Sequence, residues 1–251
     1  MKYKHQRKTI AFILVAIFCL RFLAAAKGSE GGPNPDPHPS PDPSGVALDL
    51  NEEAHLKFMR AEEKLAHDVY KYLDNYLDAE KPVYPFASIV ESESNHVASM
   101  AAKLRIYGLE DINADDAEGE FHEDNYGEYF LEKYNLLTEW GKMGHLQALM
   151  VGGLIEELDM HDIILCPSAI QDAMYIGEED CGMEYTDEEL LKDSYENLFI
   201  GSESHLQAFA GAIVLKYAST PEYDHPCYKA QYLSQDEVNT ILDVECDPDA
   251  E

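Results

Sequence analysis

The chain has 251 residues, with 49 acidic against 18 basic side chains and a formal charge of −31. A field of this sign repels nucleic acids and anionic membranes and attracts cations, so the composition argues against a nucleic-acid partner. The length is enough for one globular domain with a sizeable core, once an N-terminal leader and linker are set aside.

The first 26 residues have the three parts of a secretory signal peptide. Basic residues at 2, 4, 7 and 8 precede an apolar run over 10–20, and Ala24-Ala25-Ala26 offers small residues for cleavage. A membrane anchor is the alternative, but the run is about half the ~20 residues of a spanning helix, and Arg21 interrupts it. No later segment is long and apolar enough to cross a bilayer, so we expect a secreted protein without membrane attachment after cleavage.

Residues 27–49 form a proline-rich segment, with proline at every second position from 33 to 43. Proline removes a backbone donor and favours extended polyproline II, so a packed core is not expected there. We interpret the segment as a disordered linker that precedes one domain of about 200 residues.

Four cysteines remain once the signal peptide, with Cys19, is removed. An even count in an exported chain indicates disulfides, and four cysteines allow three pairings. Proximity in the sequence favours Cys166 with Cys181 and Cys227 with Cys246. None of them lies in a CxxC or Cys/His array, so a structural zinc site is not expected.

Apolar residues recur at helical spacing through the rest of the chain, and no alternating strand pattern of useful length is present. Proline and glycine separate the helices, with Gly108 ending the second and Pro167 the third long one. The run Thr186-Asp187-Glu188-Glu189 resembles a capping box at the start of the fourth. The long helices are predicted over 52–77, 86–107, 143–165 and 186–218, with short helices over 126–140 and, capped, near 232–237.

The long helices come as two hairpins separated by about 35 residues, a spacing that suits a long crossover. The crossover begins with the acid-rich segment 109–125, which is predicted to be a solvated loop. Two helix pairs joined by a crossover define the ferritin-like topology, whereas up-down bundles have short loops throughout. We therefore predict an all-α, ferritin-like four-helix bundle over 50–218 with short accessory helices, and a disulfide-tethered C-terminal tail over 219–251.

Each long helix carries polar side chains where its apolar face predicts core residues. Residues three or four apart share one face of a helix, and buried charges need a partner or a metal ion. A Glu on each of two helices with Glu-x-x-His on each of the other two is the pattern of di-iron and di-manganese bundles. The positions here are Glu63 on the first helix, Glu93 and His96 on the second, Glu156 and Asp159 on the third, and Ser202 and His205 on the fourth.

Several of these stretches resemble known proteins. The pattern Glu63-x-x-Ala66-x-x-x-Tyr70 and the pairs Glu93-x-x-His96 and Glu156-x-x-Asp159 resemble helices of rubrerythrin-type proteins. A closer resemblance, over roughly residues 50–240, is to a family of uncharacterised ferritin-like domains, mostly bacterial and archaeal. Its runs here are Met59-Arg60-Ala61-Glu62-Glu63-Lys64-Leu65-Ala66-His67-Asp68-Val69-Tyr70, Ile155-Glu156-Glu157-Leu158-Asp159 and Gly201-Ser202-Glu203-Ser204-His205-Leu206-Gln207-Ala208-Phe209. The resemblance implies a site for two iron ions, or manganese, with the ligands Glu63, Glu93, His96, Glu156, Asp159 and His205.

The fourth helix departs from the rubrerythrin pattern, because Ser202 stands where those proteins have a glutamate that bridges the two metals. Glu203 could turn inward, or Asp159 or Glu157 could substitute, or the second ion could be held loosely or be absent. Tyr70 is either a core residue or a hydrogen-bond donor to a ligand. We expect His67, His145 and His161 to be surface or helix-end residues.

Carboxylates with imidazole suit iron and manganese, and a bridged pair of such ions can react with dioxygen or peroxide. We therefore expect an oxidoreductase of the ferroxidase or peroxidase type, which would need an external electron donor because no rubredoxin-like CxxC is present. The alternatives are a bundle that sequesters metal ions without turnover and an acidic extracellular matrix protein. The natural metal, the substrate and the oligomeric state stay open.

Overall fold

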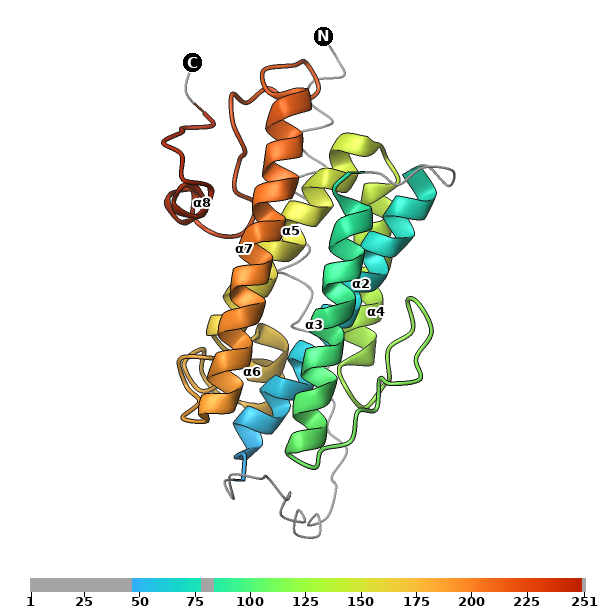
Figure 1. The fold of residues 1–251 in the computed structure, drawn as a ribbon, viewed down its shortest axis with the longest axis vertical. Helices are drawn as coiled ribbons and strands as arrows, with labels where there is room; N and C mark the ends of the chain where they lie inside the picture. Colours follow the sequence, from blue (N-terminus) through green and yellow to red (C-terminus); the bar gives the residue numbers. More distant parts are fainter. Residues whose placement is uncertain (1–46, 78–83, 250–251) are drawn as a thin grey trace. The chain divides into compact units, whose positions relative to one another are not determined.

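The structure is a computed structural model that describes residues 47–77 and 84–249. The expected signal peptide and almost all of the expected linker lie outside these residues. The regular elements of the described residues are all helices, as the sequence predicts, apart from an isolated bridge between Thr220 and Tyr223. In chain order they are α2 (Leu50–Leu77), α3 (Phe86–Ile106), α4 (Gly127–Gly141), α5 (His145–Ile164), α6 (Ser168–Met174), α7 (Glu189–Tyr217) and α8 (Gln235–Leu242) (Figure 1).

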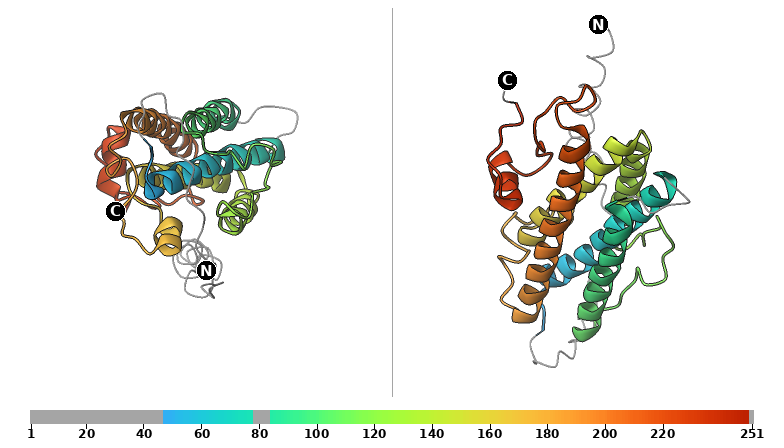
Figure 2. Two further views of the ribbon diagram at one scale, coloured as in Figure 1. Left: turned by 90° about the horizontal axis from the view of Figure 1, so that it is seen from below. Right: turned by 45° about the horizontal axis from the view of Figure 1, so that its top comes forward.

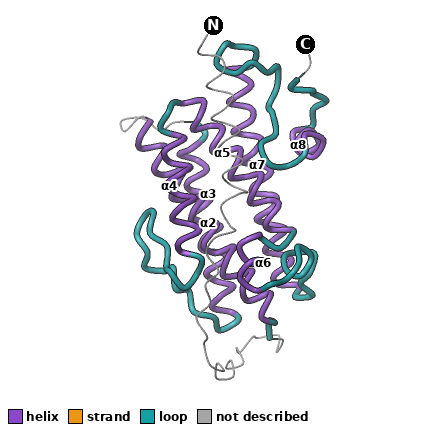
Figure 3. Tube along the Cα trace, turned by 180° about the vertical axis from the view of Figure 1, so that it is seen from behind, coloured by secondary structure: helices purple, strands orange, loops and turns teal. Residues whose placement is uncertain are grey.

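Four of the helices are long and pack in pairs. Helix α2 packs along α3, and α5 packs along α7 (Figures 1 and 2). Further contacts of α2 with α5 and of α3 with α7 join the two pairs around one core, and α4 covers α2 and α5 from outside. The long loop between α3 and α4 is drawn in teal in Figure 3. The space enclosed by the four long helices is where the polar side chains predicted from the sequence meet.

The first helix begins earlier than predicted. The side chain of Asp49 accepts hydrogen bonds from the backbone N–H groups of Asn51 and Glu52, both at 2.9 Å, which satisfies donors that a helix start leaves unpaired. Leu48 is buried in the core. Residues 47–49, which are predicted from the sequence to end the linker, therefore lead into α2, and Leu48 and Asp49 contact the helical domain.

The end of α3 follows the sequence prediction. Gly108 has φ +69°, a left-handed conformation that glycine adopts without strain, and the N–H of Leu109 donates to the Leu104 carbonyl at 2.8 Å. The loop that follows is less solvated than predicted, because basic residues of α2 hold it. Arg60 pairs with Asp111 at 3.0 Å, and Lys64 donates to the carbonyl of Ala117 at 2.8 Å.

The predicted capping box at the start of α7 does not form. Helix α7 begins at Glu189, and the hydroxyl of Thr186 donates to Glu52 on α2 while accepting from the N–H of Glu188 at 3.1 Å. A contact with a distant helix thus replaces the local cap. The final helix does have a capping box, between Ser234 and Glu237, as its sequence indicates.

Both favoured disulfides are present in the structure. Cys166–Cys181 closes the segment between α5 and α7, and Cys227–Cys246 closes the segment that contains α8. Glu157 of α5 also holds the tail, because its buried carboxylate accepts from the Tyr228 hydroxyl at 2.7 Å and from the backbone N–H groups of residues 231–233. The C-terminal tail is therefore tethered both covalently and by hydrogen bonds.

Helix α7 has the length and composition of a membrane span, contrary to the expectation that no later segment does. This is weak evidence for a membrane protein, since core helices of other proteins meet the same criteria. Here α7 packs along α5, and its inner face includes buried Leu206 and Phe209.

His55 gives the fold a testable dependence on pH. Its ring is buried, with Nδ1 2.8 Å from the Tyr195 hydroxyl and Nε2 2.8 Å from the Asp162 carbonyl. A neutral ring satisfies both contacts by accepting at Nδ1 and donating at Nε2. Burial lowers the pKa of His55 from 6.5 to about 4.

The unfolded chain protonates the His55 ring at a higher pH than the folded chain does. The contribution of the buried neutral ring to stability is therefore complete above pH 6.5 and is lost as the pH falls toward 4. We expect the free energy of unfolding to fall by about 3 kcal/mol more in the wild type than in His55→Gln over this interval. Denaturant titrations at several pH values measure the difference. Parallel curves for the two proteins would contradict the prediction.

Candidate metal centre

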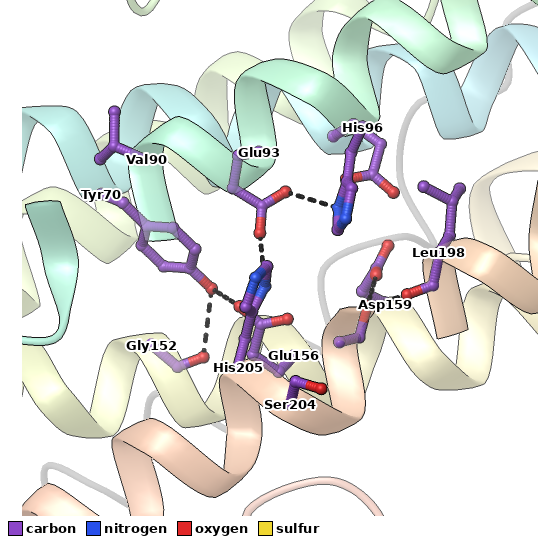
Figure 4. Close-up of polar contacts among 12 residues, drawn as sticks. Tyr70, Val90, Glu93, His96, Gly152, Glu156, Asp159, Leu198, Ser204 and His205 are labelled. Carbon is purple, nitrogen blue, oxygen red and sulfur yellow. Dashed lines mark hydrogen bonds and ion pairs between the residues drawn. The ribbon is translucent and has the colours of Figure 1, made fainter. Parts of the chain in front are cut away.

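The six predicted site residues all lie between the four long helices. Helix α2 contributes one of them, α3 and α5 two each, and α7 one (Figure 4). The side chain of His96 is 14% exposed, and the other five residues are buried. The full set is Glu63, Glu93, His96, Glu156, Asp159 and His205.

Glu93 lies between the two histidines. Its Oε2 is 3.1 Å from Nδ1 of His96, and its Oε1 is 2.8 Å from Nδ1 of His205 (Figure 4). The two imidazole rings are stacked with centroids 5.4 Å apart. One ligand atom each from Glu93, His96 and His205 lies within 4.8 Å of the other two. One carboxylate therefore joins two histidines that come from different helix pairs.

Each histidine also faces a second carboxylate. Glu63 Oε2 is 3.3 Å from Nδ1 of His96, and Glu156 Oε1 is 3.5 Å from Nδ1 of His205. The centre thus consists of a His96 half with Glu63 and a His205 half with Glu156, and Glu93 is common to both.

The three acids considered as replacements for the absent glutamate at position 202 lie in different places. Asp159 accepts a hydrogen bond from the Ser202 hydroxyl inside the centre. Glu157 points to the C-terminal tail, and Glu203 is partly exposed. The position of Asp159 therefore fits a substituting ligand, whereas Glu157 is committed elsewhere.

Neighbouring side chains fix the ligand candidates. The Tyr70 hydroxyl donates to Glu156 Oε1 at 2.6 Å, so Tyr70 is a hydrogen-bond donor to the centre as well as a core residue. Its ring packs on Phe86 and Phe209. A Cβ at Gly201 would lie 2.6 Å from the His96 ring, so only glycine lets α7 approach this ring so closely.

The charges of the centre compensate one another. Burial works against a charged imidazole, but the contacts with Glu63 and Glu93 raise the pKa of His96 to about 11. The pKa of His205 rises to about 10 for the same reason, through Glu156 and Glu93. Burial favours the neutral form of Glu93 too, yet its close contacts with His205 and His96 lower its pKa to about 2.

The remaining acids shift the other way. Burial, followed by repulsion from Asp159, raises the pKa of Glu63 well above its ordinary value. Burial and repulsion from Glu156 raise the pKa of Asp159 to about 8. Without a metal, protons therefore supply the positive charge that several buried carboxylates require. A bound cation can take the place of these protons.

One buried atom supports a metal at this place. Oε1 of Glu63 has no hydrogen-bond partner. A buried polar atom without a partner is costly, and coordination to a metal would satisfy it. Four carboxylates with two imidazoles are donors that iron and manganese accept. The residues present therefore fit such ions.

A second buried acidic pair lies beside the centre and was missed in the sequence. Glu62 and Asp162 are both buried, and burial together with repulsion from Asp162 raises the pKa of Glu62 well above its ordinary value. His161, expected at the surface, is half-buried and contacts Asp162 Oδ1 at 2.8 Å. The spacing in the sequence could have indicated that Asp162 is buried, since it follows Asp159 by about one helical turn and so lies near the same face of α5.

Comparison with known proteins gives the family. The family described as "Uncharacterized protein domain (DUF2202)" matches residues 52–245. An uncharacterised protein of Methanocaldococcus jannaschii is 32% identical over 191 residues, which are 76% of this chain and 86% of that protein. A crystal structure of a hypothetical protein from Methanococcus jannaschii superposes with a TM-score of 0.60 at 30% identity, covering 80% of this chain and 98% of that one. The chain therefore belongs to the family of the uncharacterised protein domain DUF2202.

Proposed function

We propose that this chain is an exported, ferritin-like metalloprotein that binds two iron or two manganese ions and acts on dioxygen or peroxide. The observation that carries the proposal is the position of Glu93 between His96 and His205 at 3.1 and 2.8 Å. A buried carboxylate with an imidazole on each side has the form of a ligand shared by two ions. Glu63 and Glu156 each give one half of the centre a carboxylate of its own.

The arrangement of the helices supports the ferritin-like part of the proposal. Two pairs of long helices, α2 with α3 and α5 with α7, enclose the site, and a long connection that includes α4 leads from one pair to the other. In ferritin-like bundles the metal ligands come from facing helices in the same way. The two disulfides are compatible with the oxidising environment of an exported protein.

His96 with Glu63 would hold one ion and His205 with Glu156 the other, while Glu93 would contact both. When bound, two such ions would supply a pair of electrons to a small oxidant. The chain's own contribution is positioning. Tyr70 holds Glu156 by its hydrogen bond, and the rings of Phe86 and Phe209 against Tyr70 exclude water from that side.

Two other functions are each supported by one observation. Metal sequestration without turnover is supported by Ser202, which leaves no carboxylate at the position on α7 that corresponds to Glu93 on α3. An acidic matrix role is supported by the formal charge of −31, which attracts cations. Turnover distinguishes an enzyme from a protein that sequesters metal. Metal content distinguishes both from a matrix protein, which would depend on surface charge and not on Glu93 or His96.

We expect the protein secreted without chelator to contain about two iron or manganese ions per chain, and Glu93→Ala/His96→Ala to contain almost none, because the double change removes the shared carboxylate and one imidazole. Elemental analysis measures the content. The matched control is Glu91→Ala/Asn95→Ala, two exposed positions of the same helix, which should keep the ions. A wild type without transition metal even after anaerobic loading would contradict the proposal.

Turnover is tested on the same three proteins. With iron and a reductant present, the wild type and the exposed-face control should oxidise ferrous iron or consume peroxide faster than buffer, and the Glu93→Ala/His96→Ala variant should not. Metal-loaded wild type that reacts no faster than buffer would leave sequestration as the function of the centre.

Metal binding should release protons. At neutral pH both imidazoles are doubly protonated and positively charged in the metal-free centre, since the pKa values of His96 and His205 are raised to about 11 and about 10. Coordination requires the neutral ring, so about one proton or more should leave with each Mn²⁺ bound, and affinity should fall as the pH falls. Calorimetry in buffers of different ionisation enthalpy counts the protons. Heats that do not depend on the buffer would show that the histidines are not ligands.

A further inference from the structure

The two pairs of long helices supply the centre with the same number of acids, but the acids are distributed differently within each pair. Helices α2 and α3 supply Glu63, Glu93 and His96, that is, two carboxylates and one imidazole. Helices α5 and α7 also supply two carboxylates and one imidazole, but both carboxylates come from α5 and α7 gives only the imidazole. The position on α7 that lacks an acid, Ser202, faces the second acid of α5, Asp159.

Ser202 and Asp159 are in direct contact. The Ser202 hydroxyl donates to Asp159 Oδ2, and both residues are buried. Among the described residues, this is the one hydrogen bond that the structure gives the Asp159 carboxylate. The same hydroxyl lies 3.2 Å from the Leu198 carbonyl one turn earlier, which fixes its position against the backbone of α7.

The contact directs Asp159 toward the His96 half. In Figure 4, Asp159 lies on the His96 side of Glu93, and Tyr70 lies on the opposite side. Asp159 interacts electrostatically with Glu156, Glu93 and His96, and it has the largest charge effect on Glu63, the acid of the His96 half. The Ser202 hydroxyl holds Oδ2 of this carboxylate.

We propose that Ser202, which stands where an acid is absent on α7, is a positioning residue that holds Asp159 of α5 as a ligand of the ion in the His96 half. The inference rests on the proposed function. A serine in this place orients the acid without adding a further negative charge to a centre that already buries four carboxylates. It also makes the two ions unequal, because only the His96 half depends on Ser202.

The test is the affinity for Mn²⁺ of the metal-free secreted protein, measured by calorimetry and by electron paramagnetic resonance of the bound ion. Loss of a side chain that orients a ligand commonly weakens metal binding by roughly 10- to 100-fold. Ser202→Ala should lower the affinity for one of the two Mn²⁺ ions by about this factor and leave the affinity for the other unchanged. Asp159→Asn, which keeps the volume, should weaken the same ion.

The control is Ser204→Ala. Ser204 lies on the exposed side of the same helix, and its hydroxyl donates to the Ile200 carbonyl at 3.0 Å, the same backbone contact that Ser202 makes. Both Mn²⁺ ions should bind this variant as they bind the wild type. Ser202→Thr retains the hydroxyl and should restore most of the affinity lost in Ser202→Ala.

A double-mutant cycle decides whether Ser202 acts through Asp159. If it does, Ser202→Ala/Asp159→Asn should bind Mn²⁺ like Asp159→Asn alone. Additive losses, or full affinity for both ions in Ser202→Ala or in Asp159→Asn, would overturn the inference while leaving the two-ion proposal intact. A wild type that binds no Mn²⁺ would overturn the proposed function, and the inference with it.

Discussion

The contacts of Glu93 with His96 and His205 are the interaction on which the centre depends, because Glu93 and His96 lie on α3 and the contact with His205 crosses to α7 in the other pair of helices. The same two helices also meet through an apolar contact, in which the ring of Phe86 packs against that of Phe209. Removing water from charged groups is costly unless each has a close partner of opposite sign. The four carboxylates and two imidazoles therefore lie together, which is compatible only with an arrangement in which the four long helices turn these faces toward one another.

The predictions that succeeded depend on local rules. The period of the apolar residues located the long helices, Gly108 marked the end of α3, and the short separations within each cysteine pair matched both disulfides. The six candidate ligands also followed from spacing, since residues three apart share a helix face and the same rule applied to every long helix. Their convergence in the structure agrees with this placement, although their role as metal ligands stays a proposal.

The predictions that failed involve partners far away in the sequence. Thr186 has the composition of a local cap, but its hydroxyl binds Glu52, 134 residues earlier, and α7 consequently starts later. Glu157 was ambiguous because every acid in an acidic chain resembles a surface residue, and only the folded tail reveals its four donors. Glu62 was missed because α4 covers a further face of α2, so a single apolar stripe underestimates how much of this helix is buried.

The cost of burying charged groups also separates a metal-binding role from an acidic matrix role. An acidic matrix protein needs carboxylates at its surface, and its helices could then enclose an apolar core, which is often as stable as buried charges or more so. Here the centre buries Glu63 with one oxygen unpartnered and raises the pKa of Asp159 to about 8. Both features cost free energy in the metal-free chain. A bound cation would recover that cost, whereas surface adhesion would not, and the burial of these groups therefore favours a metal-binding role over a scaffold.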